Sequence, residues 1–157
     1  MLLGIISDTH DNLLKINKAV RLFNKKKVGY VFHLGDYVAP FSCALLNKLK
    51  CPWQGVFGNN DGEKEGLLKI SADKIAIPPL RITLDNKKIT LVHDINTIQI
   101  EKENADIILF GHTHKIEIKK NKNILLLNPG EACGWLTGVS SVALLNLVDL
   151  TYKIIKL

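Results

Sequence analysis

The sequence predicts an α/β protein in which two β-sheets pack face to face with helices outside, an α-β-β-α sandwich. In the first half, short apolar runs alternate with segments whose apolar residues recur at helical spacing. The second half is mostly strand-like runs joined by turn residues. No linker, repeat or low-complexity stretch separates the halves, so we expect a single domain over residues 1–157.

The first half is predicted to run β-α-β-α-β. Asp11 or Asn12 is suited to cap the first helix, and Pro40 is suited to the first turn of the second. This order favours parallel strands connected by helical crossovers. The expected elements are a strand at 2–7, a helix from Leu13 to about Lys27, a strand at 28–34, a helix at 40–48 and a strand at 53–57.

The second half changes to a predominantly β pattern. Asp85-Asn86-Lys87 and Asn121-Lys122 are predicted hairpin turns, and residues 95–104 are expected to form one helix between strands. Both tryptophans, Trp53 and Trp135, are expected to pack in the protein, with the alternative that Trp135 flanks a pocket. The predicted elements are a short helix at 63–71 and strands at 80–85, 88–93, 106–111, 115–120, 123–128, 139–147 and 151–157.

Composition excludes several classes of protein. No apolar run approaches the roughly 18 residues that span a bilayer, and residues 1–10 are typical of a first strand, not of a signal peptide. A cytoplasmic protein without a membrane partner is therefore expected. Cys43, Cys51 and Cys133 form no C-x-x-C pair, which argues against a disulfide framework or a zinc ribbon.

The net charge of +6 raises the question of nucleic-acid binding. The lysines are spread along the chain, however, and aromatic residues make up only 6% of it. Single-strand binding would therefore lack its stacking contribution. We interpret most of the lysines as a solvated surface, with attraction of a polyanionic substrate as the alternative.

Aspartate, asparagine and histidine are concentrated at the carboxyl ends of predicted strands, where open α/β sheets bind ligands. Two carboxylates about 4 Å apart repel by about 4 kcal/mol at an effective dielectric of 20, which bound cations would relieve. Asp8 with His10, and His112 with His114, are spaced i, i+2, which suits two ligands of one metal. The clusters are Ser7-Asp8-Thr9-His10, His33-Leu34-Gly35-Asp36, Gly58-Asn59-Asn60-Asp61, His93 and Gly111-His112-Thr113-His114.

Carboxylate, imidazole and amide ligands without thiolate favour Mn, Fe, Ni, Co or Zn. A closed structural zinc site would more often contain cysteine. The chemistry of the donor set therefore predicts a site for divalent metal ions of this group, and a pair of such ions clamps and activates phosphoryl oxygens.

The ordered series D-x-H, G-D, G-N-x-D, H and G-H-x-H resembles that of the calcineurin-like metallophosphoesterase superfamily. The compact length and the Asn128–Gly134 segment resemble its small phosphodiesterase branch. The resemblance covers residues 3–157 and implies a hydrolase that cleaves a small phosphate ester with a hydroxide bridging two divalent ions (Mn, Ni, Fe, Co or Zn). The implied metal ligands are Asp8, His10, Asp36, Asn59, His93, His112 and His114.

The resemblance implies that Asp36 bridges the two metals. The first metal site is completed by Asp8, His10 and His114, and the second is completed by Asn59, His93 and His112. Asp36, His112 and Asn60 are the implied catalytic residues, with Asn60 neutralising charge on the phosphoryl oxygens. The sequence departs from the family pattern at two positions. Asn60 replaces a histidine that aids the leaving group in larger members. Asp94 replaces a glycine after His93, where it would either support a ligand or repel an anionic substrate.

Neighbouring polar residues have simpler interpretations. His33 is predicted to be a core histidine with satisfied hydrogen bonds, and Asp61 a carboxylate that caps the loop. Two other functions remain open at this point, namely a non-catalytic metal-binding scaffold of the same fold and a nuclease with steeply salt-dependent binding. A homodimer is an alternative to a monomer.

Overall fold

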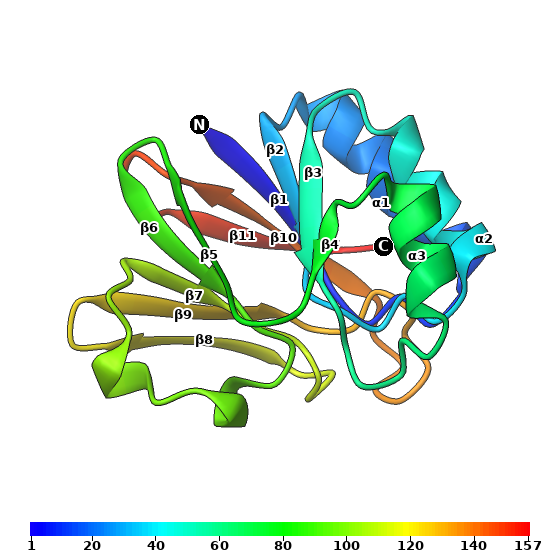
Figure 1. Ribbon diagram of the computed structural model, residues 1–157. Helices are drawn as coiled ribbons and strands as arrows, with labels where there is room; N and C mark the ends of the chain where they lie inside the picture. Colours follow the sequence, from blue (N-terminus) through cyan, green and yellow to red (C-terminus); the bar gives the residue numbers. More distant parts are fainter.

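Two mixed β-sheets form the centre of the protein in a computed structural model that describes residues 1–157 (Figure 1). The first sheet has the order β11-β10-β1-β2-β3-β4 and the second the order β5-β6-β7-β9-β8. The first contains β1 (Leu2–Ile6), β2 (Tyr30–His33), β3 (Trp53–Val56), β4 (Ile75–Ala76), β10 (Ser141–Asn146) and β11 (Tyr152–Lys156). The second contains β5 (Leu80–Leu84), β6 (Lys87–Leu91), β7 (Ile107–Leu109), β8 (Ile116–Asn121) and β9 (Ile124–Pro129).

The predicted β-α-β-α-β order of the first half is confirmed. Strands β1, β2, β3 and β4 are parallel, and β10 and β11 extend the sheet in the antiparallel sense. Helices α1 (Leu13–Lys26), α2 (Pro40–Cys43) and α3 (Lys64–Ser71) lie on the outer side of this sheet (Figure 1). Strand β4 was not predicted, because two residues are too short to show a periodic pattern.

Helix α1 shows how the sequence sets its own boundaries. The Asn12 side chain accepts a hydrogen bond from the backbone N–H of Lys15 at 3.2 Å, so Asn12 is the cap. Lys27 takes a left-handed conformation (φ 52°) and ends the helix. Ile16 and Phe23 lie on its buried face, which packs against the first sheet.

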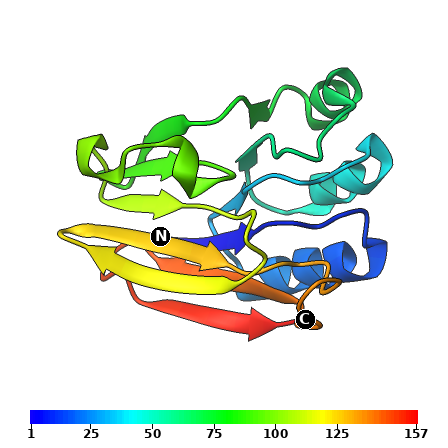
Figure 2. The same ribbon diagram turned by 90° about the horizontal axis from the view of Figure 1, so that it is seen from below.

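Each face of β1 contributes to a different core. Leu3 and Ile5 point into the cluster between the two sheets, whereas Ile6 joins the cluster under the helices. Burial on both faces explains why β1 is a continuous apolar run. Seen from below, β8 and β9 lie close to β10 and β11, so the sheets approach each other at this edge (Figure 2).

Two predicted helices have different forms in the structure. The segment 40–48 is α2 followed by a 3₁₀ helix, η1 (Ala44–Lys48). The single helix predicted at 95–104 is wrong, because this segment forms two 3₁₀ turns, η2 (Ile95–Thr97) and η3 (Ile100–Lys102). Its apolar contacts with the outer face of the second sheet come from Ile95, Ile98 and Ile100, whose spacing does not follow an α-helix.

The hairpin predictions are close to the observed turns. Asp85 and Asn86 both have positive φ (47° and 59°), as a two-residue turn between antiparallel strands requires. In the second hairpin Asn121 pairs with Ile124, so the connecting residues are 122 and 123, one position later than predicted.

Candidate metal centre

The loops after β1, β2, β3, β6 and β7 meet at one rim of the molecule. Strands β1, β2 and β3 are parallel, and so are β6, β7 and β9, so the carboxyl ends within each sheet lie together. In Figure 1 loops from distant parts of the chain gather at the lower right of the sheets. This rim carries all seven side chains that the sequence singled out as metal ligands.

Several of these residues adopt backbone conformations that are unfavourable for residues with a Cβ. Asp8 (φ 52°), Asp36 (φ 60°), His112 (φ 67°) and His114 (φ 61°) all lie in the left-handed region. Such conformations cost of order 1–3 kcal/mol each and are typical of functional sites. The fold therefore holds these side chains in place at the expense of local backbone energy.

One group of four candidate ligands faces a common point. One ligand atom from each of Asp8, His10, Asp36 and His114 lies within 4.8 Å of the others. The His114 Nε2 is 3.5 Å from Asp8 Oδ1, and the His10 Nε2 is 3.4 Å from Asp36 Oδ2. Ligands about 2.0–2.2 Å from a common cation have separations of this size.

Two atoms of this group lack any hydrogen-bond partner. Asp8 Oδ1 and His10 Nε2 are buried and unpaired, and an unsatisfied buried polar group costs about 1–3 kcal/mol. Burial also raises the pKa of the Asp8 carboxyl. A cation between these atoms would satisfy both of them, so the residues present fit a metal ion.

The other candidate ligands form a second group around Asn59. Its Oδ1 lies 2.9 Å from His93 Nε2 and 2.9 Å from His112 Nδ1. His93 Nε2 is also 3.4 Å from Asp36 Oδ2, so Asp36 lies between the two groups. Burial alone would raise the pKa of the Asp36 carboxyl, but hydrogen bonds with His93 and Asn60 hold it well below its usual range.

The outer nitrogens of two histidines are fixed by protein oxygens. His93 Nδ1 lies 2.7 Å from the Leu34 carbonyl oxygen, and His114 Nδ1 lies 2.8 Å from Glu131 Oε2. When each Nδ1–H donates to its oxygen, each Nε2 lone pair faces the centre of the site. Partners of this kind fix the tautomer and orientation of metal-binding histidines.

Sequence reasoning missed Glu131, although it singled out the segment that contains it. Glu131 is fully buried, and its carboxylate also accepts hydrogen bonds from Cys133 Sγ and from the backbone and hydroxyl of Thr137. Burial alone would raise the pKa of Glu131, but these hydrogen bonds and that with His114 hold it far below its usual range. The available signal was an acidic residue directly after a Pro-Gly turn.

Asp61 caps the Asp36 loop and His33 is a buried histidine with both ring nitrogens hydrogen-bonded, as predicted, and both residues support this loop. Asp61 accepts hydrogen bonds from the backbone N–H groups of Asp36, Val38 and Gly58. His33 Nδ1 accepts from Gly35 N–H, so its Nε2–H faces the Thr9 hydroxyl, which in turn donates to the Asp36 carbonyl. Burial lowers the pKa of His33 to about 3, which keeps the ring neutral.

Glycine is required at two points of the site because the chain passes very close to a carboxylate. A Cβ at Gly58 would collide with Asp36 Oδ1, and a Cβ at Gly111 would collide with the Ser7 hydroxyl. The Cβ added at Gly111 would also lie 2.8 Å from Asp8 Oδ2. These glycines therefore allow the loops to close around the aspartates.

The structure also places four other residues that the sequence analysis singled out. The Asn60 side-chain amide donates to Asp36 Oδ2 at 2.8 Å, at the mouth of the site. Asp94 accepts hydrogen bonds from Asn96, so it caps η2 and supports no candidate metal ligand. Trp53 is buried as predicted, whereas Trp135 is 65% exposed, so its packing in the protein interior is not confirmed and the alternative that it flanks a pocket fits the structure.

Three hollows border the metal-ligand cluster, and two of them are lined by more than one candidate ligand. The larger of these two, of about 310 Å³, is lined in part by Asn59, His93 and His112. The smaller, of about 200 Å³, is lined in part by His10, Asn60 and His114, and Trp135 lies at its wall. A compound centred on the cluster therefore has room on two sides.

Comparison with known proteins identifies the family to which this site belongs. Residues 1–150 match the model of the calcineurin-like phosphoesterase superfamily domain. The chain belongs to this superfamily. Phosphodiesterase MJ0936 of Methanocaldococcus jannaschii is 34% identical, over 98% of this chain and 97% of that protein. This chain is therefore a hydrolase that acts on phosphate esters, and we refer to it as the phosphoesterase.

Several solved structures have the same fold. An archaeal phosphodiesterase, 33% identical, superimposes with a TM-score of 0.91 over the full length of both chains. The Escherichia coli phosphoesterase YfcE has a TM-score of 0.78 at 20% identity, covering 99% and 98% of the two chains. A mutant of Vps29 from Entamoeba histolytica (TM-score 0.72, 23% identity, 100% and 98% coverage) shares the fold. No helix in this phosphoesterase is both long and apolar enough to cross a membrane.

Proposed function

We propose that this phosphoesterase is a phosphodiesterase that works with two divalent metal ions. The observation that carries the proposal is the pair of ligand groups sharing Asp36, together with the unpaired Asp8 and His10 atoms. Asp8, His10 and His114 would hold one ion, and Asn59, His93 and His112 the other. When bound, such ions supply a Lewis acid and an activated water for attack on phosphorus. Mn, Ni, Fe, Co and Zn suit these ligands.

The residues of the chain have separate tasks in this proposal. Leu34 and Glu131 fix the orientation of His93 and His114, so that little reorganisation is needed when a ligand binds. Asn60 lies at the mouth of the site with an amide that can turn from Asp36 to a phosphoryl oxygen. The diester preference is supported by the room on two sides of the cluster and by the named phosphodiesterase relatives.

A direct test measures release of p-nitrophenolate from bis-p-nitrophenyl phosphate by the metal-depleted protein after addition of Mn²⁺, Ni²⁺ or Zn²⁺. We expect activity with at least one of these ions and a loss of at least about 100-fold in Asp36→Asn and His112→Ala. If no ion supports hydrolysis, or if both variants keep wild-type activity, the proposed function is wrong.

A further inference from the structure

The larger hollow has features beyond those that a phosphoryl group needs. Its volume of about 310 Å³ lies at the lower end of the range for small-molecule sites, about 300–1,000 Å³. One side of it consists of Asn59, His93 and His112, so a ligand in the hollow touches the metal-ligand cluster. It therefore lies where the substituent of a bound phosphate ester would extend.

The hollow also has an apolar part. Phe57, Ile77 and Pro78 line it. The Ile77 side chain is 77% exposed, which is a large exposure for an isoleucine beside a polar site. A planar ring placed against this part would remove Ile77 from water, and burial of apolar surface is favourable by about 25 cal/mol per Å².

Lys64, at the start of α3, supplies a positive charge to the same hollow. Its ammonium lies 5.5 Å from the centre of the Phe57 ring and forms no ion pair with any carboxylate. The Lys64 charge is thus available to a ligand. Asp94 also lines the hollow, and its Oδ1 accepts two hydrogen bonds from Asn96 but pairs with no cation. An anionic arm is therefore preferred only if its attraction to Lys64 outweighs its repulsion by Asp94.

We propose that this hollow, bounded by Lys64 and Ile77, binds one arm of the diester substrate and selects an arm with a planar ring and an anionic group. The inference rests on the proposed diesterase function. Lys64 would pair with the anionic group, a carboxylate or a further phosphate, while Ile77 and Pro78 contact the ring. The smaller hollow beside Asn60 has room for the other arm.

The test uses p-nitrophenyl diesters that share one leaving group and differ in the second arm. The arms are methyl, phenyl, carboxyphenyl, phosphophenyl and the cationic trimethylammonioethyl group. For the wild type with Mn²⁺, we expect kcat/KM to be highest for an anionic ring and lowest for the cationic arm. The ratio between the carboxylate and phosphate arms shows which anion the hollow prefers.

Two variants separate the charge from the ring contact. Lys64→Met should lower the ratio of kcat/KM for anionic over neutral rings about fivefold, the upper range for an exposed ion pair. Ile77→Ala should lower the ratio of phenyl over methyl arms about threefold. Lys69→Met, an exposed lysine on the same helix, is the matched control and should leave both ratios as in the wild type.

The outcomes distinguish the two proposals. If the wild type cleaves the series but Lys64→Met and Lys69→Met have the same ratios, the assignment of the hollow is wrong and the diesterase function stands. If the wild type cleaves none of the diesters with Mn²⁺, Ni²⁺ or Zn²⁺, the proposed function fails, and this inference with it. Thermal unfolding of each variant checks that the substitutions leave the fold intact.

Discussion

Asn60 determines whether the site can protonate the leaving group. Its carboxamide donates a hydrogen bond to Asp36 but has no proton that it can give up to a departing alkoxide. General acid catalysis commonly contributes about 10²–10⁴-fold, so its absence affects poor leaving groups most. We expect kcat for activated aryl diesters to exceed that for alkyl diesters by at least this factor. A series of esters with graded leaving-group pKa measures it, and equal rates would refute the role assigned to Asn60.

Glu131 is predicted to support metal binding through His114. In Glu131→Gln only one oxygen remains to accept hydrogen bonds, whereas the carboxylate serves His114, Cys133 and Thr137 with two. We expect the affinity for Mn²⁺, measured by calorimetry, to fall about 10- to 100-fold. Glu101→Gln changes an exposed glutamate and is the control. Equal affinities in the two variants would show that Glu131 does not position His114.

His33 should make stability depend on pH. Its folded-state pKa of about 3 lies below the ordinary value of 6.5, so the unfolded chain takes up the proton first as the pH falls. The contribution of neutral His33 is complete above pH 6.5 and decreases towards pH 3, by up to about 1.4 kcal/mol per pH unit. His33→Gln lacks this titration. Urea unfolding measures the unfolding free energy of both proteins, and the value for the wild type minus that for the variant should decrease below pH 6.5. A difference that does not change with pH would contradict this.

At the scale of elements, the loop after β3 provides a matched pair of glycines. A Cβ at Gly58 collides with Asp36 Oδ1, whereas a Cβ at Gly62 meets nothing within 4 Å. Gly58→Ala should lower the unfolding free energy by about 1–3 kcal/mol and weaken Mn²⁺ binding, because the Asp36 carboxylate must move. Gly62→Ala should change neither. Similar stability and Mn²⁺ affinity in the two variants would mean that the close approach at Gly58 is not needed.

Elements with a clear period or a short turn were predictable from sequence. The apolar stripe and asparagine cap of α1 define it almost to the residue, and the continuous apolar run of β1 reflects burial on both faces. The segment 95–104 was not predictable in this way. Its conformation depends on contacts with the outer face of the second sheet, made by isoleucines spaced three and two residues apart. Local patterns contain no information on such contacts.

The same distinction holds for the site. The candidate ligands were visible because aspartate, asparagine and histidine follow successive strands, and parallel pairing brings those strand ends together. Glu131 was not visible, because its importance comes from burial and from five hydrogen bonds created by a loop 17 residues after His114. Metal ligands can be recognised from their positions at strand ends. The residues that orient these ligands can be recognised only from contacts in the folded protein.

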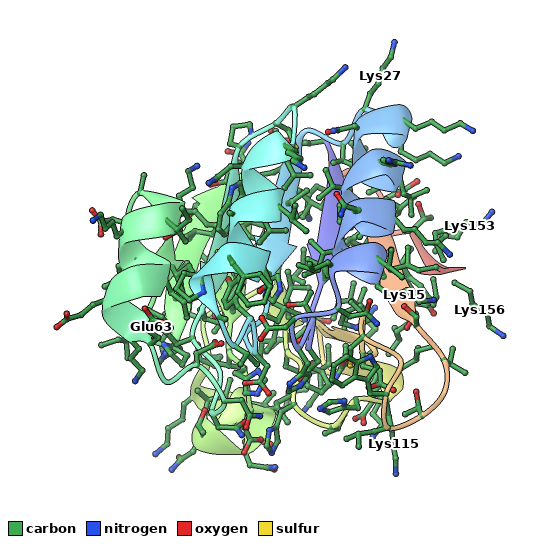
Figure 3. All side chains as sticks on the ribbon, turned by 90° about the vertical axis from the view of Figure 1, so that its right-hand side faces the viewer. Lys15, Lys27, Glu63, Lys115, Lys153 and Lys156 are labelled. Carbon is green, nitrogen blue, oxygen red and sulfur yellow. The ribbon has the colours of Figure 1, made fainter.

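For the whole molecule, the charge distribution bears on the nuclease alternative. Figure 3 shows Lys27 at the top of the view, Lys153 and Lys156 at its right and Lys115 at its bottom, so these lysines lie along one side of the molecule. A nuclease would need several cations along one path of phosphates. A non-catalytic metal-binding scaffold could have this same fold, so the fold does not separate it from an enzyme; hydrolysis and metal content do.

The central claim is that side chains from five loops, with Asp36 shared between them, hold two cations. Calorimetric titration of the metal-free protein with Mn²⁺ tests this most directly. We predict two ions per chain for the wild type and fewer than one for Asp36→Asn at the same concentrations, since both ligand groups contain this carboxylate. Binding of one ion or none by the wild type, or of two ions by Asp36→Asn, would contradict the claim.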